Sequence, residues 1–195
     1  MKINGLAIVV TETRPDLDER FAGPACNIRF DLEYAAGSYA SGRIRPAPIL
    51  EITRSSLAHL LRLMVRSGLV LRLDIRQAED WSDRPLCTNE AHIPEWIEAI
   101  ETHISTRTRR PVPFIYVSGI PPQHAYQTNL LVQELMEVGD DEALWDRVIA
   151  EGVVVCRIDD DTCSVSTTCD SIDQIRPWVR EALELSSSTI KWSQR

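Results

Sequence analysis

Apolar and polar residues alternate along several short stretches of the chain, which is the pattern of half-buried β-strands. Residues 28–34 carry Ile28, Phe30 and Leu32 between polar side chains, so one face of this strand is expected to meet the core and the other water. A second one-sided strand is predicted at 69–76. The remaining stretches with strand character lie at 6–10, 39–45, 114–117, 153–158 and 163–168.

Apolar residues spaced three and four positions apart predict helices between these strands. The helix at 53–66 has Ser55 as its N-cap and ends before Gly68. Its apolar stripe consists of Leu57, Leu60, Leu61 and Met64. Further helices are expected at 89–106, 121–138, 140–152 and 174–186. Asp140 caps the third of these, and Pro177 is expected in the first turn of the last, because a proline deeper inside would remove a hydrogen bond.

The order of these elements predicts the fold class. Strand and helix alternate through residues 69–158, which favours right-handed parallel crossovers, whereas hairpins at both ends favour antiparallel edges. We therefore expect an α/β three-layer sandwich with a mixed, partly parallel sheet; an α+β domain with helices on one face is the alternative. Residues 1–186 are expected to form a single globular domain, and residues 187–195 a loose C-terminal tail with Trp192 as a possible anchor.

Composition narrows the class of protein. The chain has 195 residues, 44% hydrophobic and 26% charged, as in an ordinary globular domain. Its longest apolar runs have about five residues, against roughly 20 in a membrane helix. The net charge is −8, which argues against duplex nucleic acid or a membrane surface as the partner.

The negative charge is concentrated in one stretch. Residues 134–161 hold ten acidic side chains against two arginines, and so carry a net −8 by themselves. Such an asymmetry indicates an electrostatic partner, although solvated faces give the same pattern. The residues predicted to bind a protein partner here are Asp140, Asp141, Asp159, Asp160 and Asp161.

Positive charge gathers in residues 43–76, which hold seven arginines against two acids. His59, Arg62 and Arg66 share one helix face at spacings of three and four residues. Arginine forks bind phosphate and carboxylate groups, so Arg62 and Arg66 are candidate ligands for a small anion or an acidic partner. The neighbouring arginines that could add to this face are Arg43, Arg45, Arg72 and Arg76; an ordinary solvated helix face is the alternative.

Five cysteines are present and none lies in a C-x-x-C pair, so zinc-ribbon and thioredoxin motifs are missing. The first residues lack a basic stretch followed by an apolar one, so we expect a cytoplasmic protein with reduced thiols. In the predicted hairpin, Cys156 should lie opposite Val165 and Cys163 opposite Ile158. The two cysteines are then diagonal neighbours on one face, as small apolar core residues.

Catalytic motifs are also missing. The chain has neither the P-loop nor the dinucleotide fingerprint, and neither the nucleophile elbow nor the H-E-x-x-H helix. It has two lysines, so lysine chemistry has almost no candidate. We therefore predict no cofactor and no metal.

One turn could still support chemistry. Ser118, Gln123 and His124 follow the strand at 114–117 and enter a helix N-terminus, a place that favours anions. Asp80 comes from the loop after the neighbouring strand, and a histidine beside a carboxylate is a workable acid–base pair. His124 as a solvated first-turn residue is the alternative.

Two functions of different classes follow. The favoured one is a cytoplasmic, non-catalytic protein-binding module of the immunity or inhibitor type, which docks through its acidic surface. The alternative is an enzyme that acts on a small anionic or nucleotide-like ligand, with His124, Asp80 and Ser118 as its catalytic residues.

Overall fold

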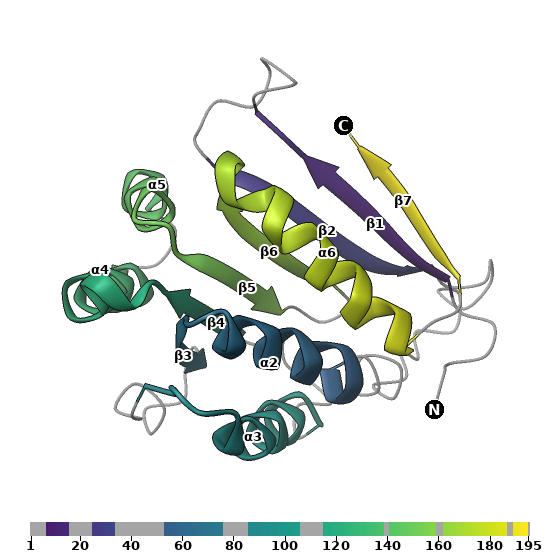
Figure 1. Cartoon of the computed structure of the whole chain (residues 1–195), viewed down its shortest axis with the longest axis horizontal. Helices are drawn as coiled ribbons and strands as arrows, with labels where there is room; N and C mark the ends of the chain where they lie inside the picture. Colours follow the sequence, from purple (N-terminus) through teal and green to yellow (C-terminus); the bar gives the residue numbers. More distant parts are fainter. Residues whose placement is uncertain are drawn as a thin grey trace.

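The computed structural model describes residues 7–15, 25–33, 53–75, 86–105, 115–138, 141–158, 162–186 and 189–194. Seven strands form one mixed sheet in the order β3-β4-β5-β6-β2-β1-β7 (Figure 1). Their bounds are Ala7–Thr13 (β1), Ala25–Glu33 (β2), Val70–Ile75 (β3), Ile115–Ile120 (β4), Val154–Ile158 (β5), Thr162–Thr168 (β6) and Ile190–Gln194 (β7). The helices are Ala58–Arg66 (α2), Ile93–Ser105 (α3), Ala125–Val138 (α4), Glu142–Ala150 (α5) and Cys169–Ser186 (α6).

Short helical turns of other types lead into three of these helices. A π-helical turn, Thr53–Leu57, precedes α2, and 3₁₀ turns at Glu90–His92 and Pro122–His124 precede α3 and α4. None of the described helices is long and apolar enough to cross a membrane.

The direction of the strands departs from the sequence prediction. All neighbouring pairs in the sheet are antiparallel except β1 with β7, so the parallel crossovers expected through 69–158 are wrong. The connections between the strands explain why neighbouring strands run antiparallel. An antiparallel bridge between Leu71 and Cys87 shows that the chain has already reversed before α3. Between β4 and β5 the chain passes through two helices, α4 and α5, so β5 returns antiparallel to β4.

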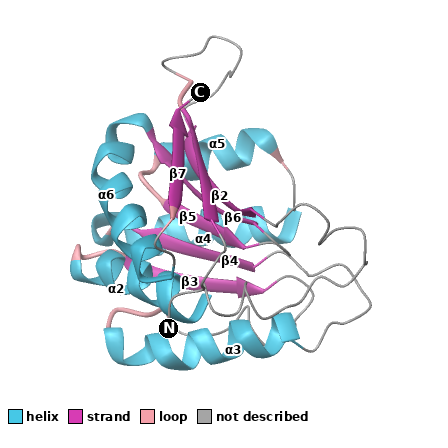
Figure 2. Cartoon of the chain, turned by 90° about the vertical axis from the view of Figure 1, so that its right-hand side faces the viewer, coloured by secondary structure: helices cyan, strands magenta, loops and turns pink. Residues whose placement is uncertain are grey.

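Two apolar clusters lie on opposite faces of β4 and β5. Ile115 and Val117 of β4 belong to the cluster that α2, α3 and α6 complete, and Tyr116 and Ile120 belong to the one that α4 and α5 complete. In Figure 2, α2 and α6 lie on one side of the strands and α5 on the other. The expected combination of a mixed sheet with helices is thus present.

Strand β3 is not one-sided as expected. Leu71 and Leu73 face the larger cluster, but Arg72 and Asp74 on the other face are only 7% and 6% exposed. Arg72 contacts Asn129 of α4, which lies over this end of the sheet. Within residues 71–75 the alternation therefore marks two buried faces, one apolar and one polar.

Several local predictions are confirmed. The predicted stripe of the first helix is buried, and Gly68 ends that helix with a positive φ of 92°, a conformation that glycine adopts without strain. The β5–β6 hairpin has the expected register, with Cys156 opposite Val165 and Ile158 opposite Cys163.

Other elements begin at residues that differ from the prediction. Helix α6 begins at Cys169 instead of 174, because Thr168 Oγ1 accepts a hydrogen bond from the Ser171 amide at 3.3 Å and starts the helix earlier. Pro177 consequently lies inside the helix, not in its first turn. The cap of α5 is Asp141 instead of Asp140, with Oδ1 accepting from the Leu144 amide at 3.0 Å.

The two ends of the described chain meet in the sheet. β1 continues to Thr13, beyond the predicted end at residue 10. Within the stretch expected as a loose tail, Ile190–Gln194 forms β7, which pairs in parallel with β1, and Trp192 packs on the core. The strand predicted at 39–45 lies outside the described residues.

Candidate functional site

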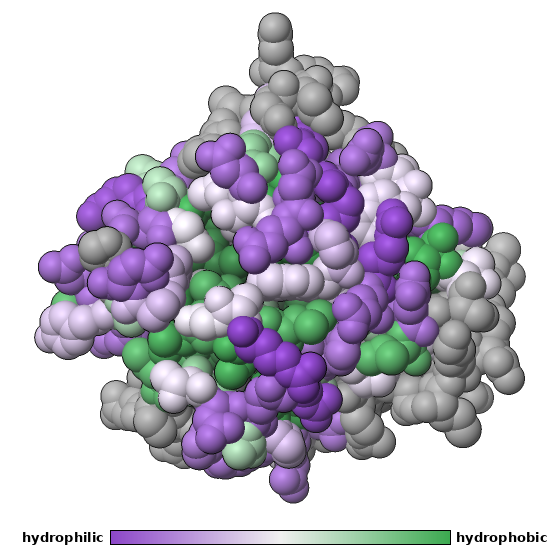
Figure 3. Space-filling view, in the orientation of Figure 1, coloured by the Kyte–Doolittle hydropathy of each residue, from purple (hydrophilic) through white to green (hydrophobic). Residues whose placement is uncertain are grey.

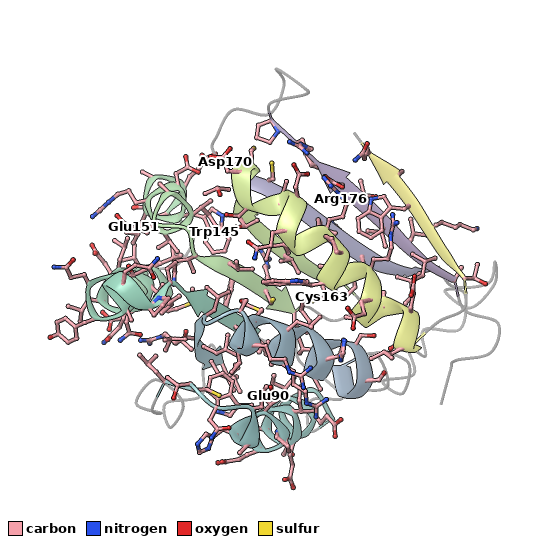
Figure 4. All side chains as sticks on the ribbon, in the orientation of Figure 1. Glu90, Trp145, Glu151, Cys163, Asp170 and Arg176 are labelled. Carbon is pink, nitrogen blue, oxygen red and sulfur yellow. The ribbon has the colours of Figure 1, made fainter. Side chains whose placement is uncertain are left out.

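The outer surface formed by α4 and α5 is the strongest candidate site. The inner sides of the two helices are held on the sheet by buried residues: Val132, Leu135, Leu144, Val148 and Ile149. Trp145 fixes α5 further, since its ring meets that of Tyr116 edge to face at 6.3 Å (Figure 4). The outward side chains therefore project from a firmly seated pair of helices.

These outward side chains are largely acidic. Within α4 and α5 the sequence has one cation, Arg147, which is exposed. The exposed acids of the surface are Glu134, Glu137, Asp141, Glu142 and Glu151, with Asp146 half-buried. We call this surface, defined by the outer side chains of α4 and α5 together with Asp141 and Glu151, the acidic surface.

Large apolar side chains stand among these acids. Tyr126 is 76% exposed, Leu130 49% and Val138 63%, and all three come from α4. Tyr126 and Leu130 are four residues apart, so they are neighbours on one side of the helix, whereas Val138 lies two turns further along and lines a different part of the surface. An exposed apolar residue alone is ordinary, but two large neighbours on one helix face are of the kind found at interaction sites.

The surface is hollowed in two places. A depression of about 330 Å³ lies between the helices, and it is lined by Gln127, Thr128, Leu130, Leu131, Glu134, Arg147 and Glu151. Figure 4 shows Glu151 at the end of α5 beside α4. A second, more open hollow is lined by Val138, Asp141, Glu142, Ala143 and Asp146. Both combine apolar and acidic walls.

Of the acidic residues predicted from sequence, the structure describes Asp141, which is exposed but also caps α5. The other four, Asp140, Asp159, Asp160 and Asp161, lie outside the described residues. The residues predicted from sequence lie at the ends of elements, whereas the described acids of the surface come mainly from the helices themselves.

The basic face of α2 is largely engaged within the protein. Arg66 donates to both carboxylate oxygens of Glu90 at 2.7 and 3.0 Å, which joins α2 to the turn before α3. This contact raises the pKa of Arg66 and lowers that of Glu90. His59 lies 2.7 Å from Glu181 of α6. Figure 3 shows a band of hydrophilic side chains on this side of the molecule, with hydrophobic areas beside it. The described pairs link α2 to the turn before α3 and to α6.

Arg62, the third residue of this face of α2, is half-buried. Arg72, expected to join the same face, lies on the opposite side of the sheet beneath α4. Arg43, Arg45 and Arg76 lie outside the described residues.

The catalytic constellation predicted around His124 is not assembled in the described residues. Strand β4 continues to Ile120, so Ser118 lies within the sheet, fully buried, and not in the turn. His124 ends the turn before α4. Its side chain and the whole of Asp80 lie outside the part of the chain that the structure describes. The apolar run at 114–117 predicted too short a strand because Ser118 and Gly119 resemble a turn.

Two ion pairs with buried members were not predicted from the sequence. Arg72 Nε and Nη2 donate to Asp74 at 2.8 Å, and Arg72 Nη1 donates to Asn129 Oδ1 at 2.9 Å. Burial raises the pKa of Asp74, although the hydrogen bonds from Arg72 oppose that rise. Opposite charges two residues apart on a strand were the available signal for this pair.

The second pair joins distant parts of the chain. Arg176 of α6 donates through Nε to Glu12 of β1 at 2.7 Å, and Glu12 is fully buried. The contact lowers the pKa of Glu12. Asp173, one turn earlier in α6, lies 2.8 Å from the third guanidinium nitrogen, Nη1. Figure 4 shows Arg176 on α6, on the side of β1 and β7. Because the partners are 164 positions apart along the chain, the sequence carried no signal for this pair.

Cysteine and metal chemistry find little support in the described part of the chain. All five cysteines are described and none is in a disulfide. Burial raises the pKa of Cys156 to about 12, so its thiol stays protonated at neutral pH and is a poor nucleophile. The described residues contain no group of three His, Cys, Asp or Glu side chains arranged to hold a metal ion.

Comparison with protein-family models, with curated proteins and with solved structures gave no match. Only the chemistry of the acidic surface therefore points to a function.

Proposed function

We propose that this protein is a cytoplasmic, non-catalytic binding module of the immunity or inhibitor type that docks a basic protein partner on its acidic surface. The observation that carries the proposal is the combination of acids with exposed apolar residues on α4. Acids alone are common on solvated helices. Tyr126 and Leu130 among them add the apolar contact area that a specific interface needs at its centre.

Electrostatics supports the same conclusion. A surface with five exposed acids and one cation attracts a basic partner over a distance and raises its association rate. The attraction is screened by salt, with a Debye length of about 8 Å at physiological ionic strength. Association should therefore be fast at low salt and slower at high salt.

We further propose that the chain is a single domain built as a three-layer α/β sandwich. The sheet around β4 and β5 is its middle layer, and α4 and α5 form one outer layer. The two apolar clusters on opposite faces of these strands support this arrangement. An outer layer of two helices presents a broad, firm surface to a partner.

The enzyme alternative has less support. One of its predicted catalytic residues, Ser118, lies inside the sheet, and both described hollows belong to the acidic surface. An anionic ligand would be repelled from that surface.

The test neutralises three exposed acids of the surface in one variant, Glu137→Gln, Glu142→Gln and Glu151→Gln. Proteins that the wild-type chain retains from a cell extract are identified, and their association rates are measured at several salt concentrations. We expect the variant to associate roughly 10-fold or more slowly at low salt and to show a flatter salt dependence, because steering is lost.

The matched control neutralises three exposed acids elsewhere, Glu98→Gln, Asp170→Asn and Glu184→Gln. The sets are comparable because Glu142 and Asp170 both lie in the first turn of a helix. Equal slowing in the two variants would mean that net charge alone acts, and unchanged rates in the first variant would overturn the proposal.

A further inference from the structure

Helix α4 has apolar side chains on two sides. Val132 and Leu135 face the sheet and are buried, while Tyr126, Leu130 and Val138 point outward. A helix that packs against its own domain on one side needs only one apolar stripe. The second stripe has no use within the described part of the molecule, and it indicates a partner that covers it.

The depression between α4 and α5 adjoins this second stripe. Leu130 belongs to both, since it is 49% exposed and also lines the depression. Glu134 and Glu151 stand on opposite helices along its walls. The volume of about 330 Å³ is at the small end of the range for ligand sites, roughly 300–1,000 Å³, and suits inserted side chains better than a whole cofactor.

We infer that the partner binds as a basic amphipathic helix that lies along the groove between α4 and α5. The inference rests on the proposed function and names the occupant of its surface. The apolar side of the partner helix packs on Tyr126 and Leu130, and an arginine or lysine pairs with the acids of the depression, where Glu134 and Glu151 outnumber Arg147. This is helix-in-groove recognition, with apolar anchors for affinity and charges for orientation.

Charge complementarity favours a basic helix over a second copy of this chain as the occupant of the groove. A second copy of this chain would place one acidic surface against another if the pair were symmetric, and like charges across an interface are unfavourable. Within the described part of the acidic surface one cation, Arg147, stands against five exposed acids, which is too little positive charge to compensate across a symmetric pair. A helix rich in arginine or lysine satisfies both the acids and the apolar stripe.

The experiment uses a synthetic, fluorescein-labelled helical peptide of about 18 residues, or about five turns, with leucines along one side and arginines along the other. Its binding to the full chain is measured by fluorescence anisotropy. The wild-type protein should bind in the micromolar range. The double variant Tyr126→Ser/Leu130→Ser should bind at least about tenfold more weakly, because the anchors lose their apolar contacts.

The control variant is Leu185→Ser on α6. Leu185 is also an exposed leucine, at 44%, but lies away from the groove, so its replacement should leave the affinity unchanged. A peptide with glutamate in place of every arginine should not bind to the wild-type protein. Circular dichroism of each variant confirms that the fold is kept.

The outcomes separate the inference from the proposed function. If the acid-neutralised variant binds its partner slowly but the Tyr126/Leu130 variant binds peptide and partner normally, the groove inference is wrong and the acidic surface still acts. If neither variant changes binding, both are wrong. Failure of the wild-type chain to bind the basic peptide, or a dimer that the Leu130 change dissociates, would also overturn the inference.

Discussion

At the scale of single residues, β3 carries a buried ion pair beneath α4. Arg72 and Asp74 have 8% of their side-chain surface exposed, and Asn129 accepts a further hydrogen bond from Arg72. Taking two charges out of water is costly, and their attraction offsets that cost only with good geometry. The pair therefore contributes more to the placement of α4 over β3 than to net stability.

This balance predicts different effects for single and double replacements. Asp74→Asn should lower the free energy of unfolding by about 3–5 kcal/mol, because it leaves the Arg72 charge buried without a counter-charge. The double variant Arg72→Met/Asp74→Leu should lose much less than the single one. Urea denaturation of the three proteins measures both values. A double variant that is less stable than Asp74→Asn would contradict this account.

At the scale of elements, α6 tolerates a proline in its interior. Pro177 lacks an amide hydrogen and so cannot donate the hydrogen bond that the helix would make at this position. The residue is exposed, while Ile175 and Val179 on either side are buried in the larger cluster. Packing of the buried stripe thus holds the helix together across an unfavourable residue.

Pro177→Ala should accordingly stabilise the protein. The change restores a backbone hydrogen bond in a helix interior, where proline costs about 3 kcal/mol relative to alanine. The gain is reduced by about 0.4–1 kcal/mol because the unfolded chain becomes more flexible. We expect a rise of about 2 kcal/mol in the free energy of unfolding. The control Glu184→Ala, on the exposed side of α6, should change it by less than about 0.5 kcal/mol.

A fall in stability for Pro177→Ala would show that the rigid proline shapes α6 to fit the sheet.

At the scale of the whole molecule, one ion pair joins the beginning and the end of the described chain. Glu12 in β1 accepts from Arg176 in α6, and Gln194 in β7 lies 3.5 Å from the same carboxylate. Arg180 of α6 adds a contact over the Trp192 ring at 5.1 Å, so α6 also holds β7 directly. The parallel pairing of β7 with β1 therefore depends on side chains of a helix as well as on the sheet.

This link makes stability depend on pH. The hydrogen bond from Arg176 lowers the pKa of Glu12 in the folded state below its ordinary value of 4.5. Such a group stabilises the fold above the unfolded pKa, and this stabilisation is lost as the pH falls through the folded pKa. Denaturation curves between about pH 7 and pH 3 should therefore show a smaller loss of stability in Glu12→Gln than in the wild type.

The control Glu184→Gln, an exposed glutamate on α6, should keep the wild-type pH profile. Arg176→Gln should be less stable than Glu12→Gln at neutral pH, because it leaves the Glu12 carboxylate buried without its partner. Identical pH profiles for Glu12→Gln and the wild type would show that this contact does not control acid stability.

Local periodicity was sufficient for much of the element structure. The stripe from Leu57 to Met64 and the register of Cys156 against Val165 follow from repeats of three to four and of two residues, which depend on neighbours along the chain. The acidic stretch was equally visible in the sequence, since charge is additive along the chain.

The candidate site was visible only in part. Periodicity places Leu130 on α4, but whether a leucine faces the core or the solvent depends on which side of the helix meets the sheet. The groove needs α5 beside α4, and that contact is set by the packing of both helices on β4 and β5.

The sequence by itself thus determined the helices, the hairpin register and the location of the acids, because these depend on interactions between residues close along the chain. Tertiary structure alone decided the direction of the strands, the burial of Asp74 and the pairing of Glu12 with Arg176. These depend on contacts between segments far apart in sequence, whose free energies are comparable for several arrangements until the whole core is packed.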